Sequence, residues 1–336
     1  MNNVASTTSD IDFVIIWVDG SDREWLKQKN HYKGVEEINA GDARYRDWDF
    51  LHYWFRAVEK YAPWVRKIHF VTCGQLPAWL NLDNPKLHFV KHSDYIDEKY
   101  LPTFSSHCIE LNLHRIEGLA EKFVYFNDDM FLNAPVSPED YFVNNVPCDS
   151  AIMNTVKMDR HGIPHVIVNN LCVIADHFDF NTQFKKNKSK WLNLKYGLGK
   201  NLRTLFMLPY RAFVGFYELH VPYSFLKSTF TEVWDKEEEL LSDVSSHKFR
   251  TTTDVNQWLM RYWQLAKGEF VPRSPKIGKL YFAQCDMDAI VDDILNSRHK
   301  MICINDDNGI KDFEAAKRRV NEAFEKMLPE KSSFEK

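Results

Sequence analysis

The chain has 336 residues, of which 44% are hydrophobic and 14% aromatic, with only 12 Gly and 13 Pro and a formal net charge of -4 at pH 7. A chain of this length can bury a full α/β core, and the composition excludes a fibrous, collagen-like or largely disordered protein. The small net charge gives no electrostatic reason to expect a nucleic-acid partner, and none is expected.

The cysteines and the N-terminus bear on the cellular compartment. Six cysteines are scattered along the chain without a CxxC pair, which disfavours both a zinc site and a disulfide scaffold. The first residues, MNNVASTTSD, lack the basic start and apolar core of a secretory signal, and no run approaches the roughly 18 apolar residues of a spanning helix. We expect a cytoplasmic protein, either free or peripheral at the inner face of the cell membrane.

The first half of the chain alternates apolar β-branched runs with segments of helical spacing. The expected elements are, in order, a strand over 13–18, a helix over 49–61, strands over 67–72 and 86–90, a helix around 109–116 and a strand over 122–126. Strands that alternate with helices predict an α/β fold with a mostly parallel sheet and helices on both of its faces.

The second half is less regular. Its expected elements are strands over 150–154 and 165–175, helices over 232–245 and 254–266, a strand over 301–304 and a helix over 313–327. A basic, aromatic-rich region at about 148–219 is interpreted as an insertion beside the active site. We expect one catalytic domain over 10–328, with flexible ends at 1–9 and 329–336.

Acidic residues follow three of the expected strands. Asp19 lies in WVDGSD, Asp128 and Asp129 in FNDDMF, and Asp306 in INDDNG. Each cluster alone is also an ordinary turn former, because Asn and Asp side chains bond to their own backbone. Three clusters at equivalent strand ends favour a shared site, since ligands of open α/β sheets bind beyond the carboxyl ends of the strands. Hard oxygen ligands around a diphosphate suit Mg²⁺ or Mn²⁺.

No glycine-rich phosphate motif accompanies these acids. The chain has neither GxGxxG after its first strand nor GxxxxGK[ST], so cations must bind any phosphate. His220 in HVPYSF and Arg250 in SSHKFRTTTD are the candidates. Taken alone, an isolated His is more often a packed or surface residue, and an Arg just before a helix is more often a solvated or capping-region charge.

Longer segments resemble the conserved regions of the Stealth family. They are DIDFVIIWVDGSD, RYRDWDFLHYWFRAVEKYAPWVRKIHFVTCGQLPAWLN with KHSDYI, LPTFSSHCIELNLHRIEGLAEKFVYFNDDMFL, HVPYSF to SSHKFR, and MICINDD, in that order. The family contains bacterial capsular and exopolysaccharide phosphotransferases and the catalytic subunit of an animal N-acetylglucosamine-1-phosphotransferase. The resemblance implies a Rossmann-like or GT-A-like nucleotide-sugar domain.

The resemblance also implies roles for individual residues. The expected catalytic residues are His220, Arg250 and Asp128. The expected metal ligands are Asp129, Asn305 and Asp306. The expected substrate-binding residues are Asp19, Gly20, Arg46, Asp47, Gln75 and Asn127. Asp47 has a second interpretation, as a cap of the helix that follows it.

The implied reaction is transfer of a hexose- or N-acetylhexosamine-1-phosphate from a UDP-sugar to a sugar hydroxyl, which releases UMP and forms a phosphodiester. The acceptor would be an oligosaccharide or a growing polysaccharide, in one version lipid-linked. His220 or Asp128 would accept the hydroxyl proton and Arg250 would bind phosphoryl oxygens. Two alternatives stay open: a metal-dependent glycosyltransferase that releases UDP, and a non-catalytic polysaccharide-binding assembly protein.

The segment 185–211 alternates basic residues with aromatic and aliphatic ones. Such a segment could lie on an anionic membrane. It could equally hold the phosphodiester backbone of an acceptor polymer, or be a solvated basic face of an ordinary packed helix.

Overall fold

The protein is described by a computed structural model that covers residues 10–33, 46–160, 162–306 and 309–336. The expected flexible segment 1–9 lies outside these residues. Among the described residues, no helix combines the length and the apolar character needed to cross a bilayer.

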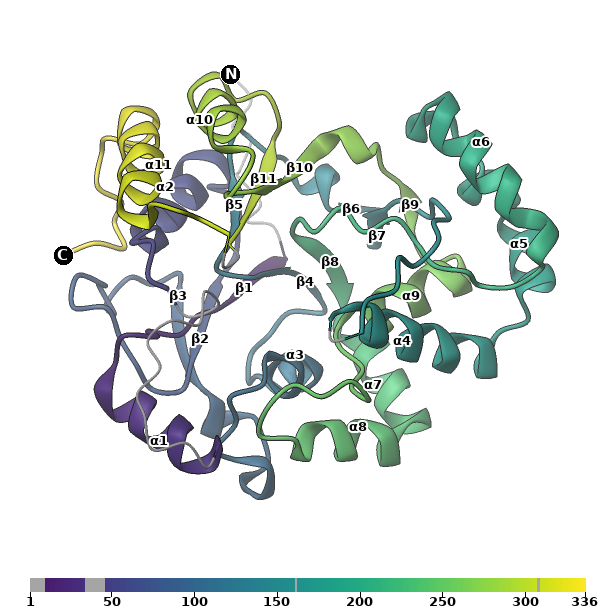
Figure 1. Ribbon diagram of the computed structural model, residues 1–336, viewed down its shortest axis with the longest axis horizontal. Coiled ribbons are helices and arrows are strands. Elements are labelled where there is room, and N and C mark those ends of the chain that lie inside the picture. Colours follow the sequence, from purple (N-terminus) through teal and green to yellow (C-terminus); the bar gives the residue numbers. More distant parts are fainter. Residues whose placement is uncertain (1–9, 34–45, 161, 307–308) are drawn as a thin grey trace, which may run out of the picture.

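A five-stranded sheet forms the centre of the molecule (Figure 1). Its strand order is β3-β2-β1-β4-β8. The strands are β1 (Ile11–Ile16), β2 (Ile68–Thr72), β3 (Leu87–Lys91), β4 (Lys122–Phe126) and β8 (Tyr223–Leu226). The first four run parallel and β8 pairs antiparallel with β4. The predicted α/β class with a mostly parallel sheet is confirmed.

Alternate residues of each central strand enter two separate cores. In β1, Phe13 and Ile15 pack into one core and Val14 into the other. Near-continuous apolar strands such as this one are expected where helices cover both faces of a sheet.

The helices divide between these two faces. The first core receives α2 (Leu51–Tyr61), α10 (Met287–Asn296) and α11 (Phe313–Met327). The second receives α3 (Ser106–Leu111), α4 (Pro164–His177), α5 (Phe180–Trp191), α7 (Lys227–Lys236), α8 (Glu238–Ser246) and α9 (Trp258–Lys267). Helix α1 (Arg23–Lys33) packs in a small third cluster with Phe104, and α6 (Leu198–Met207) lies at the outer end of the second half.

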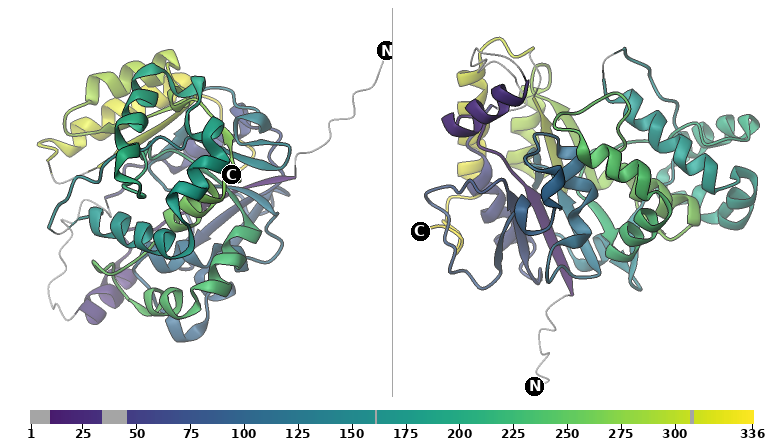
Figure 2. Two further views of the ribbon diagram at one scale, coloured as in Figure 1. Left: turned by 90° about the vertical axis from the view of Figure 1, so that its right-hand side faces the viewer. Right: turned by 90° about the horizontal axis from the view of Figure 1, so that it is seen from below.

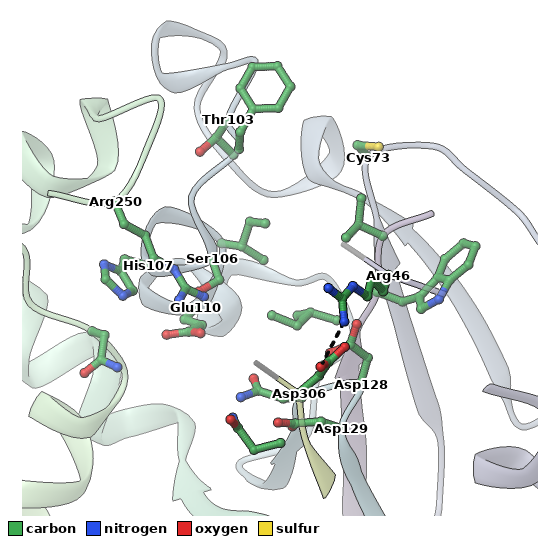
Figure 3. Close-up of a pocket in the computed structure, with 18 of the residues that line it drawn as sticks. Arg46, Cys73, Thr103, Ser106, His107, Glu110, Asp128, Asp129, Arg250 and Asp306 are labelled. Carbon is green, nitrogen blue, oxygen red and sulfur yellow. Dashed lines mark hydrogen bonds and ion pairs between the residues drawn. The ribbon is translucent and has the colours of Figure 1, made fainter. Parts of the chain in front are cut away.

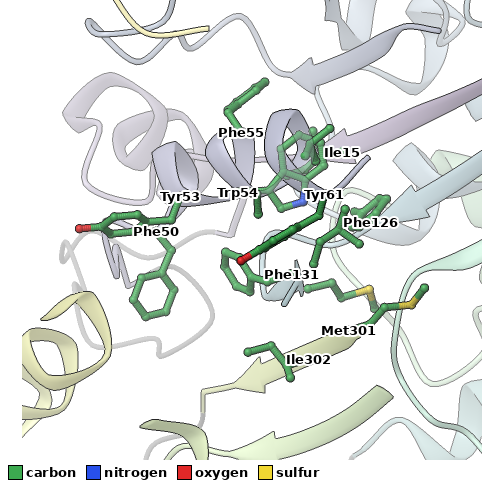
Figure 4. Close-up of a cluster of buried hydrophobic side chains, with 14 of the residues drawn as sticks. Ile15, Phe50, Tyr53, Trp54, Phe55, Tyr61, Phe126, Phe131, Met301 and Ile302 are labelled. Atoms are coloured by element: carbon green, nitrogen blue, oxygen red, sulfur yellow. The ribbon is translucent and has the colours of Figure 1, made fainter. Parts of the chain in front are cut away.

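Two smaller sheets complete the fold. One has the order β10-β11-β5, from β10 (Gly278–Phe282), β11 (Met301–Asn305) and β5 (Met130–Leu132). The other joins β6 (Phe142–Val143), β7 (Val146–Asp149) and β9 (Val271–Pro272). Figure 4 shows α2 residues such as Trp54 and Tyr61 beside Phe126 of β4, Phe131 of β5 and Ile302 of β11. The first small sheet is thereby packed into the same core as the large one.

Several elements of the second half differ from the sequence prediction. The expected strand over 165–175 is wrong, because this segment forms helix α4. Its β-branched residues suggested a strand, yet Pro164 at the first helical turn and the buried positions 166, 170, 173 and 174 follow helical spacing. Segment 150–154 is extended but makes only an isolated bridge between Met153 and Phe216.

Two predicted helices have different bounds in the structure. The helix expected over 232–245 is two helices, α7 and α8, that meet at Glu237. The helix expected over 254–266 begins at Trp258, because residues 254–256 are irregular and Gln257 takes the N-cap position. The assignment of 10–328 to one catalytic domain with an insertion stays a prediction.

The expectation of a flexible segment at 329–336 is wrong. Phe334 is buried in the first core, and residues 334–336 hydrogen-bond to residues 79–81. Arg56 donates two hydrogen bonds of 2.9 Å to the buried carboxylate of Glu335. Burial alone would raise the pKa of Glu335, but the hydrogen bonds from Arg56 and Ser332 and the charge of Arg56 together outweigh it and lower the pKa.

We predict that Glu335→Gln lowers the free energy of unfolding by about 3 kcal/mol, because Arg56 loses its buried carboxylate partner and keeps only the half-exposed Glu325. Glu325 supplies a matched control, since it also pairs with Arg56 but is half-exposed. Glu325→Gln should cost less than about 1 kcal/mol. Urea denaturation of the three proteins measures both values, and equal losses in the two variants would contradict the role given to Glu335.

Candidate active site

A pocket of about 530 Å³ opens beyond the carboxyl ends of β1 to β4. Residues directly after each of these strands line it: Trp17 and Val18, Cys73, His92, and 127–129. The chain passes from β1 to β2 on one side and places β4 on the other side of β1. The pocket therefore lies at the point where the strand order reverses, which is the usual ligand position in open α/β sheets.

Two acidic segments that are far apart in sequence meet on one side of the pocket. The turn after β4 leads directly into β5, and β5 pairs antiparallel with β11. The backbone N–H of Ile304 donates a 2.9 Å hydrogen bond to the carbonyl of Asp129. This pairing brings Asn305 and Asp306 to the Asp128–Asp129 turn, and all four line the pocket.

The two carboxylates of the turn differ in environment. The Asp128 side chain is exposed to solvent inside the pocket, and the walls of the pocket lie around it. Enclosure by the pocket walls, followed by the charge of Asp129, raises the pKa of Asp128 to about 7. The Asp129 Oδ1 atom is buried and has no hydrogen-bond partner among the described residues.

Asp306 is held from the side opposite to Asp129. Trp48 Nε1 donates a 3.0 Å hydrogen bond to Asp306 Oδ2, and Arg46 Nη1 lies 3.6 Å from Asp306 Oδ1. The Arg46 guanidinium also lies over the ring of Phe313. Arg46 thus places a positive charge at the edge of the acidic cluster.

His220 contacts the same cluster from the turn that precedes β8. Its Nε2 atom lies 3.8 Å from Asp129 Oδ2. Its backbone φ of 51° falls in the left-handed region, an uncommon conformation for a residue other than glycine that persists where surrounding structure enforces it.

A buried polar network enforces that conformation. The hydroxyl of Tyr223 accepts the N–H of His220 and donates to Glu218, both at 3.1 Å. Arg261, which is 1% exposed, then joins Glu218 to Asp149 with hydrogen bonds between 2.7 and 2.9 Å. Each charge in this network has a partner, which is the condition for burying it at tolerable cost.

The donor set fits a hard divalent cation better than zinc. Asp129, His220 and Cys303 offer ligand atoms within 4.8 Å of one another. However, burial raises the pKa of the Cys303 thiol well above its usual range, and the thiol donates a 3.2 Å hydrogen bond to Asp129 Oδ2. The remaining donors are carboxylate, amide and imidazole groups, and Asp129 Oδ1 has no hydrogen-bond partner among the described residues.

The opposite side of the pocket carries Arg250, which donates a 2.6 Å hydrogen bond to Ser106 Oγ. Figure 3 shows Arg250, Ser106, His107 and Glu110 across from the group of Arg46, Asp128, Asp129 and Asp306. A cationic side therefore faces an acidic side across the cavity.

The loop that carries Arg250 is fastened by Asp254. The Asp254 carboxylate accepts hydrogen bonds from His107 Nδ1 at 2.7 Å, from His247 Nδ1 at 2.8 Å, and from the N–H and hydroxyl of Thr251. Burial alone would raise the pKa of Asp254, but these bonds outweigh it and lower the pKa to about 2. The charged form of Asp254 thus ties the Arg250 loop to helix α3.

Glu110 is a pocket residue that sequence reasoning missed. It is 3% exposed, one carboxylate oxygen is 3.1 Å from the Tyr125 hydroxyl, and the other has no hydrogen-bond partner among the described residues. A single Glu in an amphipathic helix is usually solvated, so only the position of Glu110 within a motif segment could have indicated a role. Lys29, His107 and Trp258 also line the pocket and were not foreseen.

Three predicted substrate-binding residues do not line the cavity. Gln75 accepts the N–H of Asp19 at 2.8 Å and donates to the Asp19 carbonyl at 3.0 Å and to Asp22 at 3.0 Å. Gly20 belongs to the same turn. These bonds fix the loop after β1 against the loop after β2, so Asp19, Gly20 and Gln75 support the wall of the cavity.

The other predicted residues are brought together. Arg46, Asp47, Asn127 and the acidic and cationic residues above all line the pocket. Asp47 is not the cap of α2: the N-cap position is Phe50, and the Asp47 carboxylate accepts the N–H of Asp49 at 2.7 Å. The expected roles of these residues stay predictions.

Comparison with known proteins places the chain in a family. Three models of conserved Stealth regions match: conserved region 1 over 9–34, conserved region 2 over 44–149 and conserved region 4 over 292–336. The capsular polysaccharide phosphotransferase WcwK of Streptococcus pneumoniae is 44% identical, over 97% of this chain and 98% of that protein. The chain belongs to the Stealth family.

Two further polysaccharide phosphotransferases match the chain over nearly its full length. The exopolysaccharide phosphotransferase cps2G of Lactiplantibacillus plantarum is 41% identical over 97% of this chain and 96% of its own, and the receptor polysaccharide phosphotransferase WefC of Streptococcus gordonii is 40% identical over 97% and 98%. The galactosyltransferase LgtC, solved with donor and acceptor sugar analogs, aligns with a TM-score of 0.38 at 10% identity over 93% of this chain and 95% of that one. His220 and Arg250 lie outside the three matched Stealth regions, so their place in the site rests on geometry.

We predict that Asp254→Asn lowers the free energy of unfolding at neutral pH by roughly 2 kcal/mol, because the lowered pKa measures how much the fold favours the charged carboxylate. A depressed pKa contributes stability that is complete above the unfolded value of about 4 and is lost as the pH falls towards the folded value. The difference between variant and wild type should therefore shrink between about pH 4 and pH 2. Asp243→Asn is the control, since Asp243 lies 3.7 Å from the other nitrogen of His247 and is exposed. A loss of equal size in both variants, measured by urea unfolding, would contradict the fastening role.

Proposed function

We propose that this Stealth protein is a polysaccharide phosphotransferase that transfers a hexose- or N-acetylhexosamine-1-phosphate from a UDP-sugar to a hydroxyl of an oligosaccharide or growing capsular or exopolysaccharide. The observation that carries the proposal is the pocket at the switch point of the sheet, in which an acidic side with His220 faces Arg250. The names of its relatives, all polysaccharide phosphotransferases, support the same class of reaction.

The reaction follows from the donor's bonds. The acceptor hydroxyl oxygen attacks the β-phosphorus of the UDP-sugar and forms a new P–O bond. The bond between that phosphorus and the oxygen bridging to the α-phosphate breaks, and UMP leaves with its electron pair. The bond between the sugar C1 and its oxygen is untouched, so the product is a phosphodiester between two sugars.

The acidic side would hold a divalent cation. Asp129 and Asp306, with Asn305 assisting, are the ligands that we assign to Mg²⁺ or Mn²⁺, because they line one edge of the pocket and Asp129 Oδ1 has no partner among the described residues. Such an ion, when bound, neutralises the charge of the diphosphate and of the departing UMP. Arg46, which now lies beside Asp306, would then contact a phosphate of the donor.

Arg250 is assigned to the phosphoryl oxygens. It lies across the cavity from the acidic cluster, and its planar guanidinium suits paired hydrogen bonds to phosphate. Asp254 and Ser106 hold the loop and the side chain in place before the donor arrives. A charge positioned in advance stabilises a transition state without the cost of reorganisation.

His220 is assigned to accept the proton of the acceptor hydroxyl. Asp128 is the alternative, with a pKa raised to about 7 in the metal-free protein. A cation bound beside it would lower that pKa and make Asp128 a weaker base. His220 lines the same pocket on a backbone held by Tyr223, which favours it as the base.

The two rival functions use parts of the same structure. A glycosyltransferase would need the same donor and metal ligands, but the acceptor would attack the sugar carbon and release UDP. A polysaccharide-binding protein would use the aromatic residues of the pocket, such as Trp17, Trp48 and Trp258. Burying Glu110 and placing a cation opposite an acidic cluster both cost free energy of folding. A site that only binds polysaccharide has no need of them, whereas a catalytic site uses such charges.

The product decides between these functions. Purified protein with a panel of UDP-sugars, an acceptor oligosaccharide and Mg²⁺ or Mn²⁺ should release UMP, measured by anion-exchange chromatography. EDTA should abolish release and excess metal should restore it, and Asp129→Asn should require more metal. Release of UDP would establish glycosyl transfer, and absence of any nucleotide release across the panel would favour a binding protein.

His220→Ala and Arg250→Ala should each lower turnover by about 10² or more, as expected for loss of a proton acceptor or of a charge that stabilises the transition state. Arg250→Lys should recover only part of this loss, because the fork geometry is absent. Residues of the same types outside the pocket serve as controls: His165→Ala and Arg298→Ala should retain normal turnover, since neither residue lines the pocket. Near-normal turnover of both pocket variants would overturn their assignments.

A further inference from the structure

The helices α5 and α6 form a lobe at the edge of the molecule, defined here as residues 180–211 and called the α5–α6 lobe. Figure 1 and the right view of Figure 2 both place it at the periphery, away from α10 and α11. One side of the lobe is anchored to the body. Trp191 is fully buried among Phe180, Phe213 and Phe216, and Thr204 of α6 is buried beside Met153.

The other side of the lobe exposes large apolar side chains. Six of the thirteen exposed large hydrophobic residues among the described residues fall between 194 and 210. They are Leu194, Leu198, Leu202, Leu205, Phe206 and Tyr210, with Leu194 at 96% and Leu198 at 77% exposure. Leu198, Leu202 and Leu205 have the spacing of one helix face. Clustered apolar exposure of this kind marks a contact surface, whereas isolated exposed leucines do not.

The same lobe is strongly cationic. Between 180 and 217 the chain has eight basic residues and no acidic one, although the whole protein carries a net charge of -4. Lys190 and Lys200 contact Gly268 and Tyr217, and the exposed Arg203 donates a hydrogen bond to Asn154. The remaining five, Lys185, Lys186, Lys188, Lys195 and Arg211, are exposed and make no ion pair with a described residue. Positive charge is thereby concentrated in the same lobe as the exposed apolar side chains.

We propose that the α5–α6 lobe binds the surface of an anionic membrane. Exposed leucines and Phe206 would enter the boundary between head groups and acyl chains, while the free cations contact lipid phosphates. This combination suits a lipid surface better than a polysaccharide, because leucine offers neither hydrogen bonds nor a flat ring to a sugar. A second copy of the chain fits poorly, since a two-fold contact would bring the five exposed cations against their own copies.

The position of the lobe relative to the pocket gives the binding a consequence. Helix α5 packs on α9, and Trp258, the first residue of α9, lines the pocket. Ile163, directly before α4, lines it as well. Membrane contact through the lobe therefore fixes the orientation of the pocket relative to the lipid surface. This inference does not depend on the reaction proposed above, because binding is measured without substrate.

Flotation of the full chain with vesicles tests the proposal. Protein should float with vesicles of equal parts phosphatidylcholine and phosphatidylglycerol at low salt, and remain at the bottom with phosphatidylcholine alone. The triple change Lys185→Glu, Lys186→Glu and Lys188→Glu should raise the lipid concentration for half-binding by about 100-fold or more. The pair Leu198→Ser and Phe206→Ser should weaken binding at least tenfold, and because both side chains are exposed the fold should be retained.

Matched changes elsewhere complete the experiment. Leu82→Ser with Leu295→Ser, and Lys236→Glu with Lys276→Glu, alter exposed residues outside the lobe and should leave flotation unchanged. Four results would overturn the proposal. The first is that the protein stays with the soluble fraction at low salt, and the second is that the lobe variants float as well as the wild type. The third is that the protein does not float while the lysine variants raise the KM for long acceptor chains, which would assign the lobe to polymer binding. A concentration-dependent dimer that the leucine variants abolish, without flotation, would assign it to a second copy and contradict membrane binding.

Discussion

The antiparallel pairing of β11 with β5 is the constraint on which the site depends. β5 begins one residue after Asp129, and β11 ends at Asn305, so a hydrogen bond between Ile304 and Asp129 fixes both acidic segments at one edge of the pocket. The pairing is also buried, with Met130, Phe131, Met301 and Ile302 in the first core. Packing of apolar side chains thus determines where the carboxylates lie, and like charges are held together by contacts to which they do not contribute.

Two buried polar networks hold the residues around this acidic cluster in place. Arg261 with Glu218 and Asp149 supports the strained backbone of His220. On the other side, Asp254 accepts bonds from two histidines and fastens the loop of Arg250. Both networks lie behind the residues that face the cavity, so the geometry of the site is set before any ligand binds. Asp128 keeps a raised pKa because its enclosure in the pocket and the charge of Asp129 outweigh the opposing charge of Arg250.

The sequence was most informative where local chemistry and strand order coincide. Apolar runs that end in Asp or Asn located β1, β4 and β11 and the acids that follow them. The carboxyl ends of β1 and β4 share an edge of the five-stranded sheet, whereas β11 belongs to the small sheet and reaches the site by pairing with β5. It was least informative where contacts between distant segments decide the outcome. Helix α4 contains enough β-branched residues to suggest a strand. Its packing on α9, and the hydrogen bond from Asn170 to Asn256 in the segment before α9, favour a helix. Glu110 and Asp254 look like surface acids in the sequence, and only the fold shows that both are buried beside the pocket. Asp19 and Gln75 show the reverse case: both lie in strong motifs, but their side chains and backbone bind each other and support the wall.

The central claim is that the acceptor attacks phosphorus and leaves the sugar C1–O bond intact. A UDP-sugar with ¹⁸O in the oxygen that joins C1 to the β-phosphorus tests this directly, because mass spectrometry follows the label into either product. Phosphoryl transfer places all of the label in the new phosphodiester and none in the released UMP. Label found in released nucleotide, with an unlabelled link between the two sugars, would mean attack at carbon and would contradict the assignment of Arg250 and His220 to phosphoryl transfer.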